Sequence, residues 1–398
     1  MQISFLCGRD GTELKVPPDA LVYESCFPEP APSAAEAVLD ALQRPLGSAQ
    51  LDGLLRGSRG GDVVVVVSDI TRPIPYARFL PTLLAQVEAA GVAREAILIL
   101  IATGMHRPST PAEREEMLGP PAGQYRVVDH RADDDEGLVE LPGKSWAGSR
   151  VRLDRHYVEA GFRIVTGLVE PHFMAGFSGG RKAVCPGLAS LETIRQFHGE
   201  AFLGNPLACN ARLAGNPCHE EALSIARMAR PDFSLNVVQN RDRQVVRAFA
   251  GDLDAAHERA CEFVRSCACP RVEREADVVV TSSGGYPLDA TFYQCVKGMV
   301  SCLPAVREGG VIVSFGGCSE GIGSAEYAEL MRQYSGRWQE FLSDIRKPGV
   351  FIRDQWELQM QARALARVGQ QNLHFVTDGL ADEELQYLSV NGHAVQPG

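Results

Sequence analysis

Short, continuous apolar runs, each followed by a polar or glycine-rich segment, dominate the hydrophobic pattern of the chain. Runs of this kind are typical of strands that are buried on both faces of a parallel sheet. Between them, apolar side chains recur at helical spacing, as at Leu80, Leu83, Leu84 and Val87. The pattern therefore predicts an α/β fold with parallel sheets. The predicted strands span residues 63–67, 97–102, 164–168, 278–281 and 311–315.

The pattern also indicates how the chain is divided into domains. Residues 2–6 and 12–17 flank an Asp-Gly turn, which predicts a small N-terminal hairpin. A predicted helix at 253–266 leads into a polar, proline-containing stretch near 268–276, where we place a boundary. We expect an N-terminal cofactor-anchoring domain and a C-terminal domain that contributes substrate contacts, both with Rossmann-like sheets and with active-site loops at strand ends between them. The expected domains span residues 1–268 and 269–398.

Composition narrows the class of protein. The 398 residues carry a formal net charge of −11, which argues against a chain-wide basic surface for nucleic acid or anionic lipid. No apolar run approaches the length of a membrane span, and the first residues lack the pattern of a secretory signal. Eleven cysteines, an odd number, favour reduced thiols over a disulfide framework. We therefore expect a cytoplasmic protein with no nucleic-acid or membrane partner.

The carboxyl ends of strands are where open α/β sheets bind ligands. After the first predicted strand, Asp69 and Arg72 lie in a segment held extended by prolines. Arg72 can bind a carboxylate or phosphate with Asp69 fixing it, or the two residues can form a surface ion pair in a turn. After the second strand comes His106, which can be catalytic or structural.

The segment after the third strand joins a histidine, His172, to a glycine-rich turn at 176–180 and to the cations Arg181 and Lys182. Glycines allow a backbone to approach an anion, and the two cations can neutralise it. The spacing matches neither a P-loop nor a dinucleotide fingerprint. A purely structural glycine turn is the alternative.

In the second domain, Tyr293, Gln294 and Lys297 fall on one face of a predicted helix. Three such side chains beside a strand end can bind a polar ligand, although a solvated helix face has the same spacing.

Taken together, the motifs D-x-T-R-P-x-P at 69–75, G-M-H-R-P at 104–108, E-P-H-F-x-A-G-F-S-G-G-R-K at 170–182 and G-Y-P-L-D-x-x-F-Y-Q-x-V-K-G at 285–298 resemble the nickel-dependent lactate racemase family. Its members are 2-hydroxyacid racemases and epimerases. The likeness covers about residues 60–360.

The resemblance implies a nickel-pincer nucleotide cofactor, a pyridinium-3-thioamide-5-thiocarboxylic acid mononucleotide that holds Ni(II). By motif, it is linked covalently to Lys182, and His198 is the protein's nickel ligand. A soft donor set plus imidazole suits Ni(II). The resemblance also implies partner proteins that make the cofactor: a carboxylase, a sulfur transferase and a nickel insertase. The other cofactor-binding residues are expected to be Asp69, Gly176, Ser178, Gly179, Gly180 and Arg181.

The same resemblance makes His106 and His172 the acid/base pair. Racemisation needs a group on each side of one carbon, and the pKa of histidine, near 6.5, suits both proton donation and acceptance. The expected substrate contacts are Arg72 and Lys297 for the carboxylate and oxyanion, Tyr293 and Gln294 for hydrogen bonds, and Trp356 as an aromatic wall, although a helical tryptophan is usually part of a core.

The expected function is inversion of C2 of a 2-hydroxy acid, lactate or a larger relative such as malate, by proton-coupled hydride transfer to and from the cofactor. An NAD-dependent 2-hydroxyacid dehydrogenase is one alternative, which the missing G-x-G-x-x-G fingerprint disfavours. A nucleotide- or nickel-binding protein without turnover is another. It would need neither His172 nor the carboxylate-binding cations Arg72 and Lys297.

Overall fold

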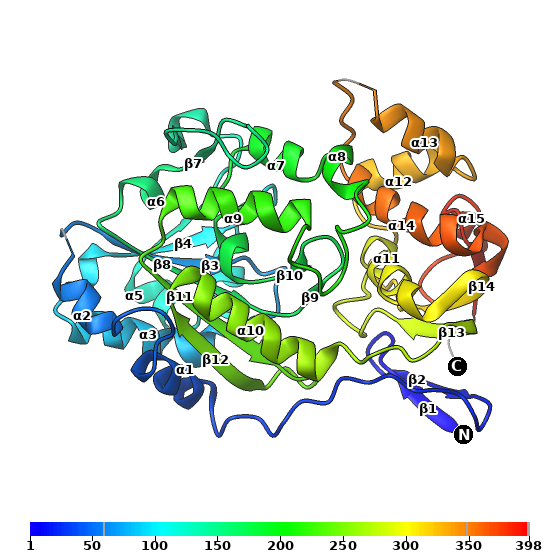
Figure 1. The fold of residues 1–398 in the computed structure, drawn as a ribbon, viewed down its shortest axis with the longest axis horizontal. Coiled ribbons are helices and arrows are strands. Elements are labelled where there is room, and N and C mark those ends of the chain that lie inside the picture. The colour runs from blue at the N-terminus through cyan, green and yellow to red at the C-terminus, as the bar shows by residue number, and fades with distance from the viewer. Residues whose placement is uncertain (59, 348, 396–398) are drawn as a thin grey trace. The chain divides into compact units, whose positions relative to one another are not determined.

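The computed structural model describes residues 1–58, 60–347 and 349–395 and divides into two compact units (Figure 1). The larger unit comprises residues 24–197 and 207–270. The smaller unit comprises residues 1–23, 198–206 and 271–398. The predicted α/β class with parallel sheets is confirmed, and each unit has its own sheet.

The larger unit is built on a six-stranded sheet. All neighbouring strands are parallel except β12, which runs antiparallel to β11 at one edge. The three strands that precede the predicted site segments are neighbours, in the order β8, β3, β4. Their carboxyl ends therefore meet at one edge of the sheet. In sheet order the strands are β12 (Val245–Gly251), β11 (Phe233–Gln239), β8 (Phe162–Leu168), β3 (Val63–Ser68), β4 (Ile97–Ala102) and β5 (Arg126–Asp129).

Helices cover both faces of this sheet. On one face, the fully buried side chains of Leu80 and Leu84 pack into a core with Val65 and Ile99. On the other face, α10 packs through Cys261 and Val264. A capping box begins α4, since the Thr110 hydroxyl and the Glu113 carboxylate each accept a backbone N–H. The helices are α1 (Ala34–Gln43), α2 (Leu51–Arg56), α3 (Tyr76–Ala89), α4 (Pro111–Leu118), α5 (Pro121–Gln124), α6 (Arg155–Glu159), α7 (Leu191–Phe197), α9 (Pro217–Ala229) and α10 (Leu253–Ala268).

Short elements follow the long strands of the larger unit. β9 (Pro171–His172) and β10 (Gly176–Phe177) form a tight antiparallel pair directly after β8. They lead into the 3₁₀ helix η3 (Gly180–Ala183), which carries Arg181 and Lys182. A second small pair consists of β6 (Leu138–Glu140) and β7 (Arg152–Asp154).

The smaller unit has a four-stranded, fully parallel sheet in chain order. Its strands are β13 (Ala276–Ser282), β14 (Val306–Phe315), β15 (Leu373–Thr377) and β16 (Asn391–Ala394). Its helices are α8 (Glu200–Leu203), α11 (Phe292–Ser301), α12 (Ala325–Gln333), α13 (Trp338–Ile345), α14 (Gln355–Val368) and α15 (Asp382–Leu385).

The N-terminal hairpin forms as predicted, from β1 (Gln2–Phe5) and β2 (Thr12–Lys15), but it belongs to the smaller unit. The Asp289 carboxylate accepts the backbone N–H of Gly8 at 2.7 Å and that of Gly317 at 3.0 Å. The Phe5 ring stacks on Phe315. The contacts with Asp289, the aspartate of the G-Y-P-L-D motif, and with Phe315 explain why the hairpin belongs to the smaller unit, although residues 24–197, which follow it in the chain, belong to the larger one.

The strand at residues 278–281 was predicted to be buried on both faces, and this part of the prediction is wrong. Residues 278–281 do form a strand, but β13 lies at the edge of its sheet and Val278 is 54% exposed. An apolar run of valines fits both a central and an edge strand, so the sequence pattern alone does not separate the two.

Among the described residues, no helix has both the length and the apolar character needed to cross a bilayer.

Candidate active site

A histidine–carboxylate pair lies at the carboxyl ends of β3 and β4. The strands are paired in register up to Ser68 and Ala102, so the loops that carry Asp69 and His106 start side by side. His106 Nδ1 lies 2.5 Å from Asp69 Oδ2, and the Thr71 hydroxyl donates to Asp69 Oδ1 at 2.6 Å. Burial raises the pKa of Asp69, but the hydrogen bonds from His106 and Thr71 outweigh it and hold that pKa below its usual value. The carboxylate is therefore ionised, and it accepts a hydrogen bond from His106 Nδ1–H, which leaves Nε2 as the other nitrogen of the ring.

Asp69 was expected to fix Arg72, and here the structure differs. Both carboxylate oxygens are engaged by Thr71 and His106, while Arg72 acts on Asp69 only through its charge. The Arg72 side chain is exposed at the same strand end. The exposed Arg72 guanidinium can therefore bind an anion that enters from solvent, and the Asp69 carboxylate positions the His106 ring.

His172 has the complementary arrangement. Its Nδ1 accepts the backbone N–H groups of Met174 and Ala175, each at 3.2 Å. An Nδ1 that accepts cannot carry the proton, so the neutral ring is protonated on Nε2. His106 thus presents Nε2 as a proton acceptor, whereas His172 presents Nε2–H as a donor. The tight β9–β10 turn supplies both amides and so sets this difference.

The glycine-rich turn is filled by the protein itself. A Cβ on Gly176 would lie 2.0 Å from the carbonyl oxygen of Arg212, and one on Gly180 would lie 2.6 Å from the His257 ring. The N–H of Gly180 donates to Asn236 Oδ1 at 2.8 Å. The Ser178 hydroxyl donates to the Leu168 carbonyl and accepts the N–H of Glu170. These contacts explain the glycines as sites of close packing.

Arg181 is fully buried and has an internal set of partners. Its guanidinium donates to the carbonyls of Ala175 and Phe177 at 2.8 and 2.9 Å and lies 2.8 Å from His257 Nε2. Burial and the charge of Arg181 hold the pKa of His257 well below its usual value, so this histidine is neutral. The contacts of Gly176, Ser178, Gly180 and Arg181 join the ends of neighbouring strands, and the phosphate-binding role of these residues and of Gly179 stays a prediction.

Replacing Arg181 by methionine is expected to lower the free energy of unfolding by several kcal/mol, since each buried acceptor left unsatisfied costs about 1–3 kcal/mol. Urea unfolding measures the change. Arg241→Met is the control, because the Arg241 side chain is 65% exposed. A loss as small as that of the control, within about 0.5 kcal/mol, would show that the buried guanidinium is not structural.

Lys182 lies directly after Arg181 in η3, with a half-buried side chain. Its backbone N–H donates to the Gly179 carbonyl at 3.1 Å, and its carbonyl accepts from Gly187 at 3.2 Å. The neighbouring turn is thus rigid on both sides, and it fixes the position from which the amine extends.

In the smaller unit, Trp356 joins two of the other predicted residues. It lies at the start of α14 and is 7% exposed. Its indole N–H donates to the Tyr293 hydroxyl at 2.6 Å, and its ring contacts the His198 ring at a centroid distance of 4.8 Å. The predicted nickel ligand and a predicted substrate contact are therefore both held by one buried indole.

The segment that carries His198 is itself fixed to α14. Arg363 donates to the Asn205 carbonyl at 2.7 Å, and Gln359 donates to the Glu200 carbonyl. His198 therefore belongs to the smaller unit, although α7, which ends one residue earlier, belongs to the larger one. The expected domain limits placed this histidine in the first domain.

Lys297 and Gln294 lie together on the half-buried face of α11, and the ammonium of Lys297 donates to Gln294 Oε1. Fully buried Glu357, on the adjoining α14, faces the charge of Lys297. Burial raises the pKa of Glu357 to about 8, although the charge of Lys297 opposes the shift. This acid lies next to Trp356 in sequence, and the sequence analysis missed it, because only burial distinguishes it from a surface glutamate.

Glu357 makes stability depend on pH. The pKa of a glutamate rises from 4.5 to about 8 here, so the unfolded chain loses its proton first and stability falls as the pH rises between these values. Glu357→Gln removes this loss. The melting temperature of the variant relative to the unmodified protein is expected to increase from pH 4.5 to pH 8. The exposed residue Glu383 provides the control, as Glu383→Gln. Equal differences at both pH values would contradict the assignment.

Comparison with known proteins identifies the family of the chain. The model of the lactate racemase N-terminal domain matches residues 7–209, and that of the C-terminal domain matches residues 272–394. The chain is 37% identical over 338 residues to the lactate racemase of Thermoanaerobacterium thermosaccharolyticum, covering 84% of this chain and 78% of that protein. It is 37% identical over 358 residues to the lactate racemase of Lactiplantibacillus plantarum, covering 89% and 82%.

Solved structures give the same result. The lactate racemase apoprotein from T. thermosaccharolyticum superposes with a TM-score of 0.90 at 33% identity, covering 98% of this chain and 92% of that one. A Thermotoga maritima protein shares the fold alone, with a TM-score of 0.64 at 17% identity over 87% and 93% of the chains. Fold and site thus define a two-unit α/β protein with histidines at strand ends. The chain belongs to the lactate racemase family.

Proposed function

We propose that this protein is a racemase that interconverts the two enantiomers of a 2-hydroxy acid, with lactate as the first substrate to test, and that it uses a nickel-pincer nucleotide linked to Lys182. The relatives named above support the lactate assignment, since both are lactate racemases. The observation that carries the proposal is a pair of histidines that follow β4 and β8 and whose Nδ1 atoms have opposite kinds of partner. His106 Nδ1 lies against the Asp69 carboxylate, and His172 Nδ1 accepts two backbone N–H groups, so we assign His106 Nε2 as the proton acceptor and His172 Nε2–H as the donor.

The residues present fit the cofactor in the chemistry of their donors. Among the described residues no three His, Cys, Asp or Glu side chains form a metal-binding group. A metal that arrives with sulfur and carbon donors from its own organic ligand needs only one more, and the imidazole of His198, held against Trp356, is suited to that position. Lys182 supplies the amine for the covalent link. When bound, the cofactor supplies a hydride acceptor for the hydrogen on C2.

The chain's own residues handle the substrate's charge and its hydroxyl proton. Arg72 and Lys297 neutralise the carboxylate and the oxygen on C2, and Gln294 orients Lys297 through its side-chain oxygen. For one enantiomer, His106 Nε2 takes the hydroxyl proton, and the Asp69 carboxylate stabilises the imidazolium that results. On the mirror-image side the oxygen regains a proton from His172 Nε2–H, and the proton held by His106 then restores the His172 Nε2–H through solvent. Tyr293, fixed by Trp356, adds a hydrogen bond to the bound acid.

The test is racemisation by protein produced together with the carboxylase, sulfur transferase and nickel insertase. The loaded protein is expected to interconvert D- and L-lactate without added NAD. Substrate deuterated at C2 is expected to keep its label in the inverted product. Malate and longer 2-hydroxy acids, assayed in parallel, define the substrate range.

Two results would contradict the proposal. Complete loss of deuterium to water at early conversion points to a base that removes a proton from C2. Accumulation of free keto acid only when NAD is added points to a dehydrogenase.

A further inference from the structure

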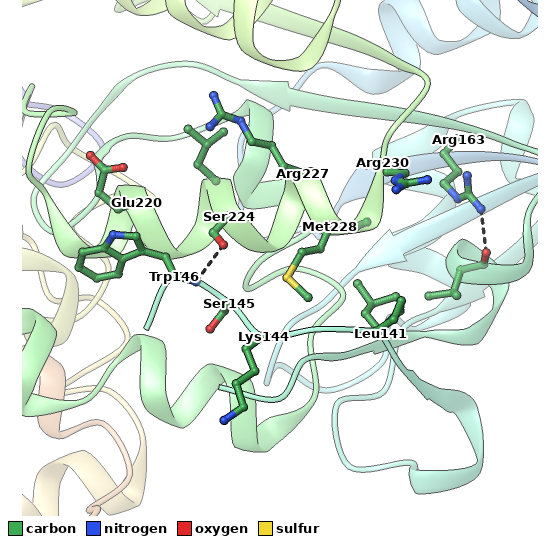
Figure 2. A pocket seen from close by; sticks show the side chains of 14 residues that line it. Leu141, Lys144, Ser145, Trp146, Arg163, Glu220, Ser224, Arg227, Met228 and Arg230 are labelled. Atoms are coloured by element: carbon green, nitrogen blue, oxygen red, sulfur yellow. Dashed lines mark hydrogen bonds between the residues drawn. The ribbon is translucent and has the colours of Figure 1, made fainter. Parts of the chain in front are cut away.

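A cavity of about 780 Å³ lies in the larger unit, between the segment that follows β6 and the helix α9 (Figure 2). It shares no residue with the candidate active site. Leu141, Leu223 and Met228 contribute apolar surface to it. Figure 2 shows Trp146 towards one end of the cavity and Arg230 towards the other, and the Lys144 side chain extends from the segment below them towards the bottom of the view. The volume falls within the range of about 300–1,000 Å³ that is usual for small-molecule sites.

The loop that carries Trp146 is fixed to α9. The N–H of Trp146 donates to Ser224 Oγ at 2.9 Å, and the N–H of Ala147 donates to Glu221 Oε2 at 2.8 Å. Glu221 and Ser224 lie one helical turn apart, so the loop is held at two points. The indole nevertheless stays 57% exposed at the cavity. A large aromatic ring held rigidly in water is a surface on which a planar group can stack with little loss of conformational entropy.

The lining has an excess of positive charge. Four cations, Lys144, Arg163, Arg227 and Arg230, face a single carboxylate, Glu220. Two of the cations are neutralised from outside the cavity, since Arg163 pairs with Asp232 at 3.6 Å and Arg227 with Asp254 at 2.8 Å. In the part of the chain that the structure describes, no carboxylate lies within 4.0 Å of the charged groups of Lys144 or Arg230. A negatively charged ligand would neutralise the charges of Lys144 and Arg230.

The backbone at Arg230 adds an independent observation. Arg230 caps the C-terminus of α9 in the left-handed region, with φ at 51°. Glycine is favoured at this position of a helix, because a side chain there is strained. The Arg230 side chain is therefore held at the cavity by a backbone conformation that glycine would adopt with less strain.

We propose that this cavity binds a small aromatic anion of the nucleoside monophosphate type. The planar base stacks on the indole of Trp146, as bases stack on aromatic side chains in nucleic-acid sites. The phosphate is bound by Lys144 and Arg230, for which the structure provides no other counter-charge. The site is separate from the proposed racemase chemistry and requires neither nickel nor the cofactor.

The test is calorimetric titration of the full chain, produced without the cofactor-making proteins, with adenosine monophosphate. Adenosine and inorganic phosphate are titrated separately as the two halves of the ligand. The monophosphate is expected to bind saturably and more tightly than either half. Trp146→Ala and Arg230→Gly are each expected to weaken binding at least about tenfold.

Arg243→Gly is the matched control, because Arg243 is also an exposed arginine at positive φ, 59°, and lies outside the cavity. Arg230→Gly relieves backbone strain, so this variant is expected to fold at least as well as the unmodified protein, and its melting temperature checks this. Three results would overturn the proposal: no saturable binding of the monophosphate, binding unchanged in both cavity variants, or inorganic phosphate binding as tightly as the monophosphate. Since no turnover is measured, failure here leaves the racemase proposal standing.

Discussion

Replacing Lys182 by alanine is expected to abolish covalent attachment of the cofactor and, with it, detectable racemisation. The reason is that no other side chain of the 170–182 motif carries an amine, since Arg181 is a guanidinium buried among carbonyl groups. The contacts that shape η3 come from the backbone of Lys182, so the alanine variant is expected to fold. Intact mass after denaturation, on protein produced with the cofactor-making proteins, measures the adduct directly.

Two variants make this experiment decisive. Lys182→Arg keeps a positive charge but not the amine, and it is expected to lose the adduct as completely as the alanine variant. Lys347→Ala removes an exposed lysine of the smaller unit, whose side chain pairs with Asp344, and it is expected to keep the adduct. An adduct that survives in Lys182→Ala would assign the attachment to another residue. Nickel content, measured on the same samples, shows whether the metal depends on the link.

The rule that open α/β sheets bind ligands at the carboxyl ends of their strands located the segments that carry the candidate site. Apolar runs located β3, β4 and β8, and the segments after them contain Arg72, His106, His172 and Lys182. The order β8-β3-β4 could not be predicted, because it depends on which strands pair across the sheet. For the same reason the Asp69–His106 pair was missed, although two polar residues that follow consecutive parallel strands are a signal for such a pair.

Contacts that depend on burial could not be predicted. The glycine turn and Arg181 have the composition of an anion site, but the sequence does not show that Arg212, Asn236 and His257, from distant parts of the chain, pack against them. A one-dimensional pattern does not show whether a guanidinium faces solvent or a ring of carbonyls. The hairpin was predicted correctly, but the sequence did not show which unit contains it, because the contacts that join it to Asp289 and Phe315 come from residues about 280–310 positions later.

Removing either histidine of the candidate acid/base pair is expected to have a similarly large effect on racemisation. His106→Ala and His172→Ala are each expected to lower racemisation by about 10²–10⁴-fold, the usual loss when a general acid or base is removed. His156 offers a close control in the same unit. Its side chain is 43% exposed and its Nδ1 lies 3.2 Å from the Asp154 carboxylate, whereas that of His106 is 51% exposed with its Nδ1 2.5 Å from Asp69. His156→Ala is expected to retain activity.

Asp69→Asn tests whether the Asp69 carboxylate only holds the His106 ring in place or also stabilises the charged form of that ring. The amide can keep the ring in place, but it no longer stabilises the imidazolium and does not fix the proton on Nδ1. We expect kcat to fall with little change in KM, together with a shift in the acid limb of the pH profile. A fall in melting temperature with an unchanged pH profile would mean that Asp69 only supports the fold.

The two histidines are held differently, yet their removal cannot slow only one direction. Enantiomers have equal free energies, so the equilibrium constant is unity and kcat/KM must fall by the same factor for both. The asymmetry instead appears in which partial step survives. In His106→Ala the enantiomer that gives its hydroxyl proton to His106 should no longer form bound keto acid in a single turnover. In His172→Ala the same enantiomer should still form bound keto acid, because His106 is present, but its mirror image should not be released. Bound keto acid formed from both enantiomers at normal rates in either variant would exclude a two-histidine mechanism.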